Sequence, residues 1–268
     1  MDPALNEWLN LLLRWTHIFA GILWIGSTWF FTWLDGRLHE EEAHAGRKPQ
    51  VWMVHSGGFY VVEKQSQPDL GRALHWFRYE AAITWLTGIL LLALVYYHGG
   101  LMVDSDVADI SEGAALAIGI GVLFFSWPVY DGLMNSPIGR HDRLAAVAGF
   151  LLIAASAYGL TQWLSARAAY MHVGAVLGSL MTANVWMRIL PAQRKMIAAT
   201  SAGKEPDAKL AARAKLRSKQ NTFMVVPVVF LMISSHYPTV TYGHRYNWII
   251  LSALVLAGFV VAKFIRRA

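Results

Sequence analysis

The sequence predicts an all-α integral membrane protein: a polytopic helical bundle of about seven transmembrane helices, with its N-terminus outside and its C-terminus inside. Two observations lead to this fold class. Of the 268 residues, 56% are hydrophobic and only 15% are charged, and the apolar residues form long runs instead of alternating faces. At this hydrophobicity only helices satisfy their own backbone hydrogen bonds in lipid. The whole chain, residues 1–268, is expected to be one membrane domain in contact with the lipid bilayer.

The first apolar run extends from Trp15 to Leu34 and contains no charged residue. Its length suits a hydrocarbon layer of about 30 Å at a rise of about 1.5 Å per residue, so we expect a helix that stays in the membrane and not a cleaved signal peptide. Further low-charge runs of similar length occur at residues 81–103, 113–130, 144–166, 168–187, 222–237 and 246–262.

The basic residues predict the orientation of these spans. When the spans are followed in order, 20 Lys and Arg residues fall on one side and three on the other, namely Arg14, Arg167 and Arg245. Basic residues accumulate in cytoplasmic loops, so the side with 20 is expected to be inside. The loop on the opposite side also carries acidic residues, at Asp104, Asp106, Asp109 and Glu112.

Two polar segments are expected to lie at the cytoplasmic surface. The centre of the first, residues 51–65, is apolar and aromatic around a Gly57-Gly58 pair, which predicts a short interfacial or re-entrant piece. The second, residues 191–219, has alanines and basic residues at helical spacing. This pattern is typical of an amphipathic helix that rests against anionic headgroups.

The chain contains no cysteine. Disulfides, zinc-thiolate sites, iron–sulfur clusters and covalently attached c-type haem are therefore excluded from this chain. The isoelectric point of about 9.6 could indicate a nucleic-acid partner. Because the basic residues lie in loops between apolar spans, membrane topology explains them better, and no nucleic acid is expected.

Four histidines predict a site near the outer surface. His17 follows Arg14 by three residues, His172 follows Arg167 by five, and two more end the second and sixth runs, at His98 and His236. Neutral imidazoles from different helices, with glycines nearby, suit the axial coordination of a b-type haem iron. We take His17 and His172 as the iron ligands and the other two as alternatives. Each histidine alone could instead be an interfacial residue, and the four together could bind copper in place of haem.

A second group of polar residues lies at the inner ends of the runs. It comprises carboxylate, guanidinium and carboxamide side chains, at Glu80, Asp131, Asn184, Arg188 and Asn221, with Arg72, His75 and Thr84 nearby. Charges near hydrocarbon are usually paired, so Asp131 or Glu80 with Arg188 could be a purely structural ion pair. The mixture of groups also suits a planar anion that is rich in hydrogen-bonding groups.

Several stretches resemble the membrane domain of the bacterial membrane-bound, cytochrome-c-linked urate oxidases. The likeness extends over nearly the whole chain and is most distinctive in its second and third stretches. The stretches are Arg14-Trp-Thr-His17 to Gly26, Trp52-Met-Val-His-Ser-Gly-Gly-Phe-Tyr to Gln65, Tyr170-Met-His-Val-Gly174 through Asn184-Val-Trp-Met-Arg188 to Lys195, and Asn221-Thr-Phe-Met to Pro238.

The resemblance implies a multi-pass protein of the bacterial inner membrane that oxidises urate to 5-hydroxyisourate and passes electrons to a c-type cytochrome. Family members of the fused type carry a C-terminal c-type haem domain. This chain has no cysteine for one and stops inside, so the acceptor is expected to be a separate c-type cytochrome, unless the chain is a truncated form.

The same resemblance suggests roles for the inner residues. Arg188 or Arg72 would pair with the urate anion, whereas Asn184, Gln65 or Asn221 would hydrogen-bond its amide edges. The released proton would pass to a basic group, at Glu80, Asp131 or His75. The electrons would pass through haem b near His17 and His172.

Other classes of protein share parts of this pattern. The opening His and Trp-Ile-Gly segment also looks like haem-binding proteins of the protoporphyrinogen oxidase type and copper-resistance membrane proteins. A membrane transporter would use the inner charges without a redox centre, and a role in binding or assembly would need neither site.

Overall fold

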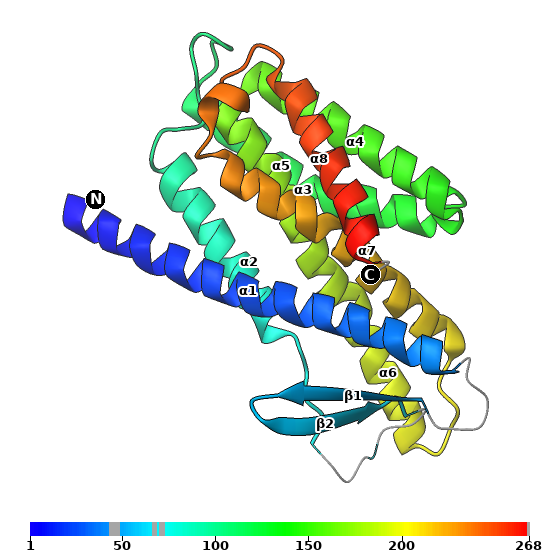
Figure 1. Ribbon diagram of the computed structural model, residues 1–268. Coiled ribbons are helices and arrows are strands. Elements are labelled where there is room, and N and C mark those ends of the chain that lie inside the picture. The colour runs from blue at the N-terminus through cyan, green and yellow to red at the C-terminus, as the bar shows by residue number, and fades with distance from the viewer. Residues whose placement is uncertain (43–48, 66–68, 70–72, 267–268) are drawn as a thin grey trace.

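The computed structural model describes residues 1–42, 49–65, 69 and 73–266, and most of these residues are helical (Figure 1). The predicted all-α class is confirmed, with one β-hairpin added in the described part of the chain. The elements are α1 (Pro3–Glu42), β1 (Gln50–His55), β2 (Gly58–Glu63), α2 (Tyr79–Leu92) with a π-helical turn (Ala93–Tyr97), α3 (Glu112–Asn135), α4 (Asp142–Trp163), α5 (Ala166–Ala183) with a π-helical turn (Asn184–Ile189), α6 (Leu190–Ser201), α7 (Ala208–Ser234) and α8 (Asn247–Ile265).

Six helical stretches are long and apolar enough to cross a membrane, as counted over the described residues. They are Pro3–Glu42, Tyr79–Tyr97, Glu112–Asn135, Asp142–Trp163, Ala166–Ser201 and Asn247–Ile265. The remaining predicted span, residues 222–237, forms the C-terminal part of α7, which ends at Ser234 and begins with a basic, alanine-rich half. The described helices are thus compatible with a membrane protein, and six of the seven predicted runs meet the length and hydropathy of a span.

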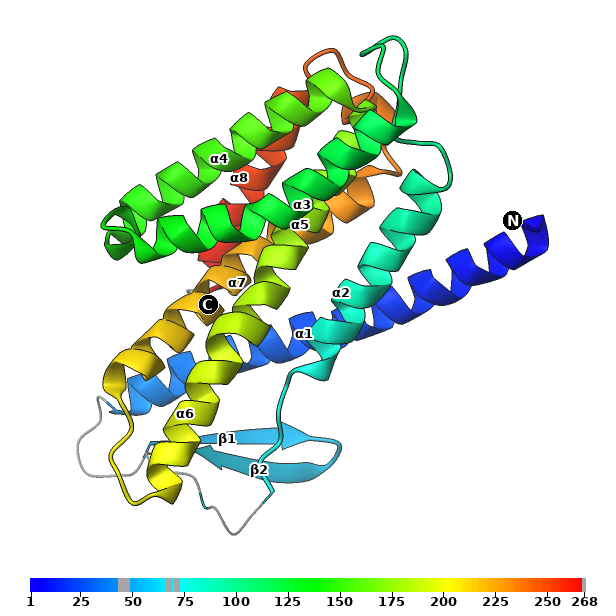
Figure 2. The same ribbon diagram turned by 180° about the vertical axis from the view of Figure 1, so that it is seen from behind.

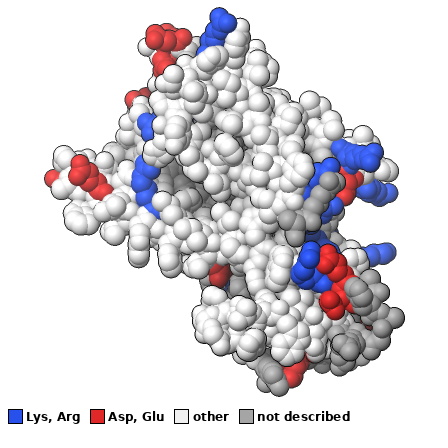
Figure 3. All heavy atoms as spheres, viewed as in Figure 1, with Lys and Arg blue, Asp and Glu red and all other residues white. Residues whose placement is uncertain are grey.

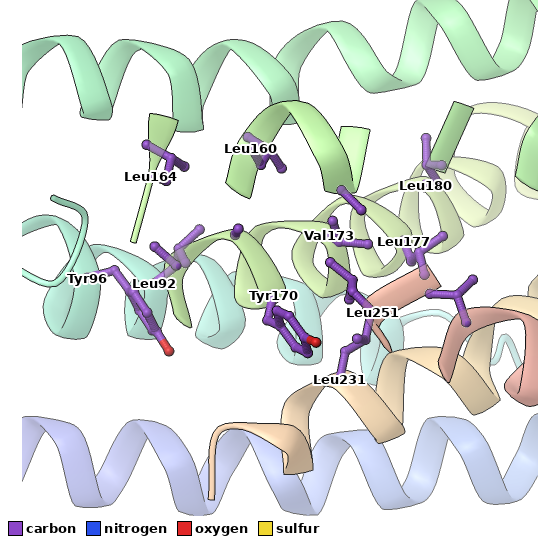
Figure 4. Packing of buried hydrophobic residues seen from close by; sticks show 14 of the residues in the cluster. Leu92, Tyr96, Leu160, Leu164, Tyr170, Val173, Leu177, Leu180, Leu231 and Leu251 are labelled. Carbon is purple, nitrogen blue, oxygen red and sulfur yellow. The ribbon is translucent and has the colours of Figure 1, made fainter. Parts of the chain in front are cut away.

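Helix α5 lies at the centre of the bundle, where α2, α3, α4 and α7 pack against it and α8 covers α4 and α7 (Figures 1 and 2). Most of its side chains are buried. Figure 4 shows Tyr170, Val173 and Leu177 of α5 next to Leu231 of α7 and Leu251 of α8. Burial on nearly every face is consistent with the many small residues of α5, which let the neighbouring helices approach it closely.

Helix α1 packs mainly along α2, contacts β1 and α7 in its C-terminal half, and leaves much of its N-terminal half open. Its N-terminal half extends beyond α2 in both ribbon views (Figures 1 and 2). Apolar side chains remain exposed along it, for example Trp8 at 61%, Trp15 at 66% and Ile22 at 63%. Figure 3 shows that charged side chains gather towards the ends of the molecule and that much of the middle is uncharged. Such a surface is typical of helices that face lipid.

The two polar segments fold differently from each other. Residues 50–63 form an antiparallel hairpin in which Gln50 pairs with Glu63 and His55 with Gly58. Its turn contains Ser56 and Gly57 with φ of 50° and 75°, the left-handed conformations that two-residue hairpin turns need. Residues 191–219 form α6, which continues α5, and the first part of α7, with a turn at Gly203 between them.

Two glycines provide a test of helix packing. A methyl group at Gly258 of α8 would lie 2.8 Å from the backbone nitrogen of Pro227 in α7, whereas at Gly149 of α4 it would meet no atom within 4 Å. We expect Gly258→Ala to lower the free energy of unfolding by about 1–3 kcal/mol. Gly149→Ala should be neutral or stabilising by up to about 1 kcal/mol, through helix propensity. Thermal unfolding in detergent measures both, and equal shifts of the two variants would contradict the packing of α7 on α8.

Candidate functional site

Three elements position a group of polar side chains near the predicted inner end of the bundle. We call it the inner polar cluster and define it as Tyr130, Asp131, Asn184, Arg188, Arg217 and Asn221. The first two lie near the end of α3, the next two on the π-helical turn after α5, and the last two on α7. A π-helical turn places one extra residue in a helix and is frequent at functional sites.

Asp131 is the anionic centre of the cluster. Arg188 donates two hydrogen bonds to its carboxylate, from Nε to Oδ1 at 2.9 Å and from Nη2 to Oδ2. Arg217 donates from Nη2 to Oδ1 at 2.7 Å, and Asn135 donates to Oδ2 at 3.0 Å. Asp131 is only 9% exposed. One buried carboxylate therefore joins α3 to both the π-helical turn and α7 through charge-assisted hydrogen bonds.

A chain of amide and phenol groups lies beside this ion-pair network. Asn184 donates to the hydroxyl of Tyr130 and to Oδ1 of Asn221, both at 2.9 Å. The Tyr130 hydroxyl donates to Gln220 at 2.6 Å, and Asn221 donates to the Met181 carbonyl at 3.0 Å. The guanidinium of Arg217 lies over the Tyr130 ring at 5.1 Å. These contacts hold the two asparagines in fixed orientations inside the protein.

The cluster has unused hydrogen-bonding capacity and an excess of positive charge. Within the described residues, Nη1 of Arg217 and Oδ1 of Asn184 are buried without a hydrogen-bond partner. The side chains are 2% and 0% exposed. Two guanidinium groups contact a single carboxylate, so the ion-pair network carries one surplus positive charge. Such an arrangement can bind an anion that accepts from a guanidinium and donates to a carboxamide.

Arg217 and Tyr130 were not among the predicted site residues. Arg217 falls in the basic segment 191–219, where every Lys and Arg was attributed to membrane topology. The sequence did contain a usable signal, because Arg217 precedes Asn221 by four residues and α7 therefore presents both side chains on one face.

The structure brings together only some of the predicted inner residues. Asp131, Asn184, Arg188 and Asn221 meet as described, whereas no hydrogen bond or ion pair of the described residues links Glu80, His75 or Gln65 to them. Gln65 is exposed and donates to Glu63 at 3.0 Å, and the exposed His75 ring lies 4.6 Å from Phe77. Arg72 lies outside the described residues.

Glu80 is nevertheless close to the π-helical turn. It stands in the first turn of α2, and the next residue, Ala81, packs with Val185 and Leu190. Its Oε2 atom is buried without a hydrogen-bond partner in the described part of the chain. An unpaired carboxylate oxygen at this place is free to accept a hydrogen bond or a proton.

His17 lies between α1 and α2. Its Nδ1 donates to the Thr84 carbonyl at 2.8 Å and lies 3.2 Å from the Thr87 hydroxyl. A methyl group at Gly88 would come within 2.9 Å of the His17 ring, so the glycine makes room for it. Since the Nδ1 hydrogen goes to a carbonyl, Nε2 keeps its lone pair, and none of the described residues hydrogen-bonds to it.

His172 is completely buried in the centre of the bundle. Its Nδ1 donates to the Ala168 carbonyl at 2.8 Å, and its Nε2 accepts from the Tyr97 hydroxyl at 3.1 Å. A methyl group at Gly119 of α3 would come within 2.6 Å of Nε2. Tyr97 belongs to the π-helical turn after α2, so each of the two π-helical turns contributes to a buried polar contact.

The structure does not place the four histidines at one depth. His17 contacts α2 near Gly88, whereas His172 contacts Tyr97, nine residues or about 13 Å further along the same helical stretch. The reason is that α1 begins at Pro3, so that Arg14 lies within the helix and donates to Asn10 instead of marking its end. His98 and His236 are exposed at the ends of their helices.

These contacts decide how a haem would fit. A haem-ligating histidine commonly donates its Nδ1 hydrogen to a carbonyl and leaves Nε2 for the iron, which is the arrangement of His17. The residues around His17 therefore fit one axial ligand. Nε2 of His172 is already occupied by Tyr97, and the two imidazoles do not face each other. No three His, Asp or Glu side chains of the described residues form a group that could hold a metal ion.

A family model described as urate oxidase N-terminal matches residues 3–268. The chain belongs to the urate oxidase N-terminal family. The match covers nearly the entire chain, including all six residues of the inner polar cluster, and it indicates an oxidoreductase related to urate oxidation. No curated protein and no solved structure matches the chain. Membership of the urate oxidase N-terminal family thus supports the resemblance inferred from the sequence motifs at the level of the family.

The ion-pair network makes a prediction about stability. Asp131→Asn leaves two guanidinium groups without their counter-charge, so we expect the free energy of unfolding to fall by about 3–5 kcal/mol. Asp142→Asn removes a carboxylate that is 66% exposed and pairs with Lys219 at 2.8 Å, and it should cost at most about 1 kcal/mol. Thermal unfolding of both variants in the same detergent measures the difference. A loss no larger for Asp131→Asn than for Asp142→Asn would show that the network is not integral to the fold.

Proposed function

We propose that the chain oxidises urate to 5-hydroxyisourate at the inner polar cluster of a bacterial inner-membrane protein and delivers the electrons to a separate c-type cytochrome. The balanced reaction is urate plus water giving 5-hydroxyisourate, two protons and two electrons, which reduce two ferric cytochromes. One observation carries the proposal. Two arginines share the single carboxylate of Asp131, and Oδ1 of Asn184 beside them has no hydrogen-bond partner among the described residues, in a chain of the urate oxidase N-terminal family.

Urate is a planar anion with amide edges, and each part of the cluster has a matching group. Arg188 is 29% exposed at its side chain and Arg217 only 2%, so the anion would approach Arg188 from the cytoplasmic side, where purines are broken down. Asn184 has a free acceptor for an N–H group of the ring, and the orientation of its amide is fixed by Tyr130 and Asn221. Fixed donors and acceptors orient a planar ligand without a further entropic cost.

The protons released by the reaction need a base near the ring. Glu80 is the best candidate, since its Oε2 is buried beside the π-helical turn and no described residue hydrogen-bonds to it. Asp131 accepts from two arginines and is therefore a weaker base. His75 is exposed and would receive protons only on their way to water. Gln65 and Arg72 remain proposed contacts from the resemblance alone.

His17 would hold a haem b, with His98 and His236 as further candidates, and His172 could take part only if Tyr97 released its Nε2. A haem bound there would supply a one-electron carrier between the inner cluster and the outer face. The chain contributes in two ways: the Thr84 carbonyl fixes the tautomer of His17, and Gly88 leaves room for the imidazole ring.

Substitution of Arg188 tests the substrate assignment. Removing a charge-assisted contact costs about 1.5–3 kcal/mol, so Arg188→Gln should raise the KM for urate about 10- to 100-fold. Arg188→Lys keeps the charge but loses the paired geometry and should lie between Arg188→Gln and the wild type. Arg140→Gln, at an exposed arginine on the same predicted side, serves as the control. Urate-dependent reduction of ferricytochrome c is the measurement, and an unchanged KM in Arg188→Gln rejects the site.

Substitution of His17 tests the haem assignment separately. The reduced-minus-oxidised spectrum of the purified protein should show a b-type band that urate induces. His17→Ala should remove the band, whereas His39→Ala, at an 86% exposed side chain of the same helix, should leave it intact. A normal band in His17→Ala assigns the ligand elsewhere, and a b-type band that urate does not reduce eliminates urate as the electron donor.

A further inference from the structure

The β-hairpin has two faces with opposite environments. Its inner face carries Val51, Met53 and Val62, which pack against Leu34 and Leu38 of α1. Because side chains alternate along a strand, their neighbours Trp52, Val54, Phe59 and Val61 all point to the other side. We call these four residues the outer hairpin face.

The outer hairpin face is strongly apolar and uncovered. Its side chains are exposed at 68% for Trp52, 71% for Val54, 80% for Phe59 and 46% for Val61. Register pairs Trp52 with Val61 and Val54 with Phe59, so the four form one continuous patch. Because these exposed fractions are high, little of the patch is covered by other described residues. An isolated apolar patch of this kind marks a contact with something outside the chain.

The position of the hairpin points to the bilayer. In both ribbon views the strands lie along the C-terminal half of α1, and their turn is directed back towards the start of α2 (Figures 1 and 2). Exposed aromatic side chains occur nearby: the ring of Phe31 in α1 lies 5.0 Å from that of Phe77 in the turn before α2, and Tyr79 begins α2. Aromatic side chains at this level are typical of a membrane–water interface.

The charges around the hairpin fit the same environment. At its base, Lys64 binds Asp35 of α1 at 2.7 Å, and Lys215 of α7 binds the same carboxylate at 2.9 Å. Arg78 lies over the Tyr79 ring at 4.8 Å. The basic residues beside the patch therefore lie on the side of the chain that holds 20 of the 23 Lys and Arg residues, where anionic headgroups would attract them.

We infer that the outer hairpin face inserts into the cytoplasmic leaflet of the membrane, at the boundary between headgroups and acyl chains. The inference rests on the membrane location proposed above. Both strands have unpaired backbone edges, which do not occur in the hydrocarbon core, so insertion is limited to a depth of about 5–10 Å, where water still reaches the backbone.

Lipid suits this face better than a protein partner does. A stable protein–protein interface buries about 800 Å² on each side and involves roughly 20–30 residues per partner. The outer hairpin face offers four, on a two-stranded element joined to the rest of the molecule by a small apolar contact. Four apolar side chains next to an aromatic belt are enough for an interfacial anchor, because each aromatic side chain buries about 150–250 Å².

The cysteine-free chain allows this inference to be tested with single labels. Phe59→Cys, Leu256→Cys and Lys204→Cys would each be labelled with an environment-sensitive fluorophore in nanodiscs that contain anionic phospholipid. Leu256 is 48% exposed in the middle of α8, and Lys204 is exposed in the turn between α6 and α7. Lipids with a nitroxide near the headgroup or deep in the acyl chain serve as quenchers.

The expected pattern differs for the three labels. The label at residue 59 should have blue-shifted emission and should be quenched more by the shallow nitroxide than by the deep one. The label at residue 256 should be quenched more by the deep nitroxide. Neither nitroxide should quench the label at residue 204. A label at 59 that behaves like that at 204, while 256 reports deep lipid, overturns the hairpin inference and leaves the membrane location intact. Loss of lipid quenching at 256 would instead reject the membrane location itself.

Two further results separate the remaining partners. A label at 59 that is shielded from water but not quenched by either nitroxide would indicate a second copy or another protein, and it too overturns the inference. A charge placed in the patch provides an independent check, because it should oppose insertion into the membrane. Phe59→Asp should therefore reduce the quenching, by the shallow nitroxide, of a label at Val54→Cys. The neighbouring His55→Asp, outside the patch, should leave that quenching largely unchanged.

Discussion

The carboxylate of Asp131 is the single group on which the inner half of the structure depends. It is buried near the end of α3, and it receives guanidinium groups from the π-helical turn after α5 and from α7. Desolvating three charges is costly, and their mutual attraction compensates only when the geometry is good and the other hydrogen bonds are satisfied. The bidentate contact with Arg188 meets the first condition. Nη1 of Arg217 and Oδ1 of Asn184 have no hydrogen-bond partner among the described residues, so the second condition is not met.

Both π-helical turns lie where the chain brings polar groups into the apolar bundle. One carries Tyr97, which donates to His172, and the other carries Asn184 and Arg188. In each case the irregular turn shifts side chains relative to the regular helix that precedes it, at some loss of backbone hydrogen-bond quality. Both turns carry polar side chains that hydrogen-bond to groups on other helices.

The sequence allowed the helical class, most spans and four of the six residues of the inner polar cluster to be predicted, because long apolar runs and the polar residues at their ends are local features. Asp131, Asn184, Arg188 and Asn221 were all predicted in this way. Arg217 was missed, since nothing local separates a buried arginine from the solvated ones around it. The depth of His17 was also wrong, because Arg14 looked like a helix end and a long-range contact with α2 decides where the ring lies. The short apolar runs at residues 51–54 and 59–62, rich in β-branched and aromatic residues and separated by a turn that contains Ser56 and Gly57, would have predicted the hairpin.

His172 and Arg188 lie on one uninterrupted helical rod, since α5, the π-helical turn and α6 follow one another without a loop. Sixteen residues separate them, a distance of about 24 Å along the axis. Any displacement of the rod along its axis, caused by a ligand that binds at Arg188, would therefore also move His172 relative to Tyr97. If urate binds at Arg188 as proposed, its binding would be mechanically linked to the environment of the buried imidazole of His172, because no loop lies between the two residues.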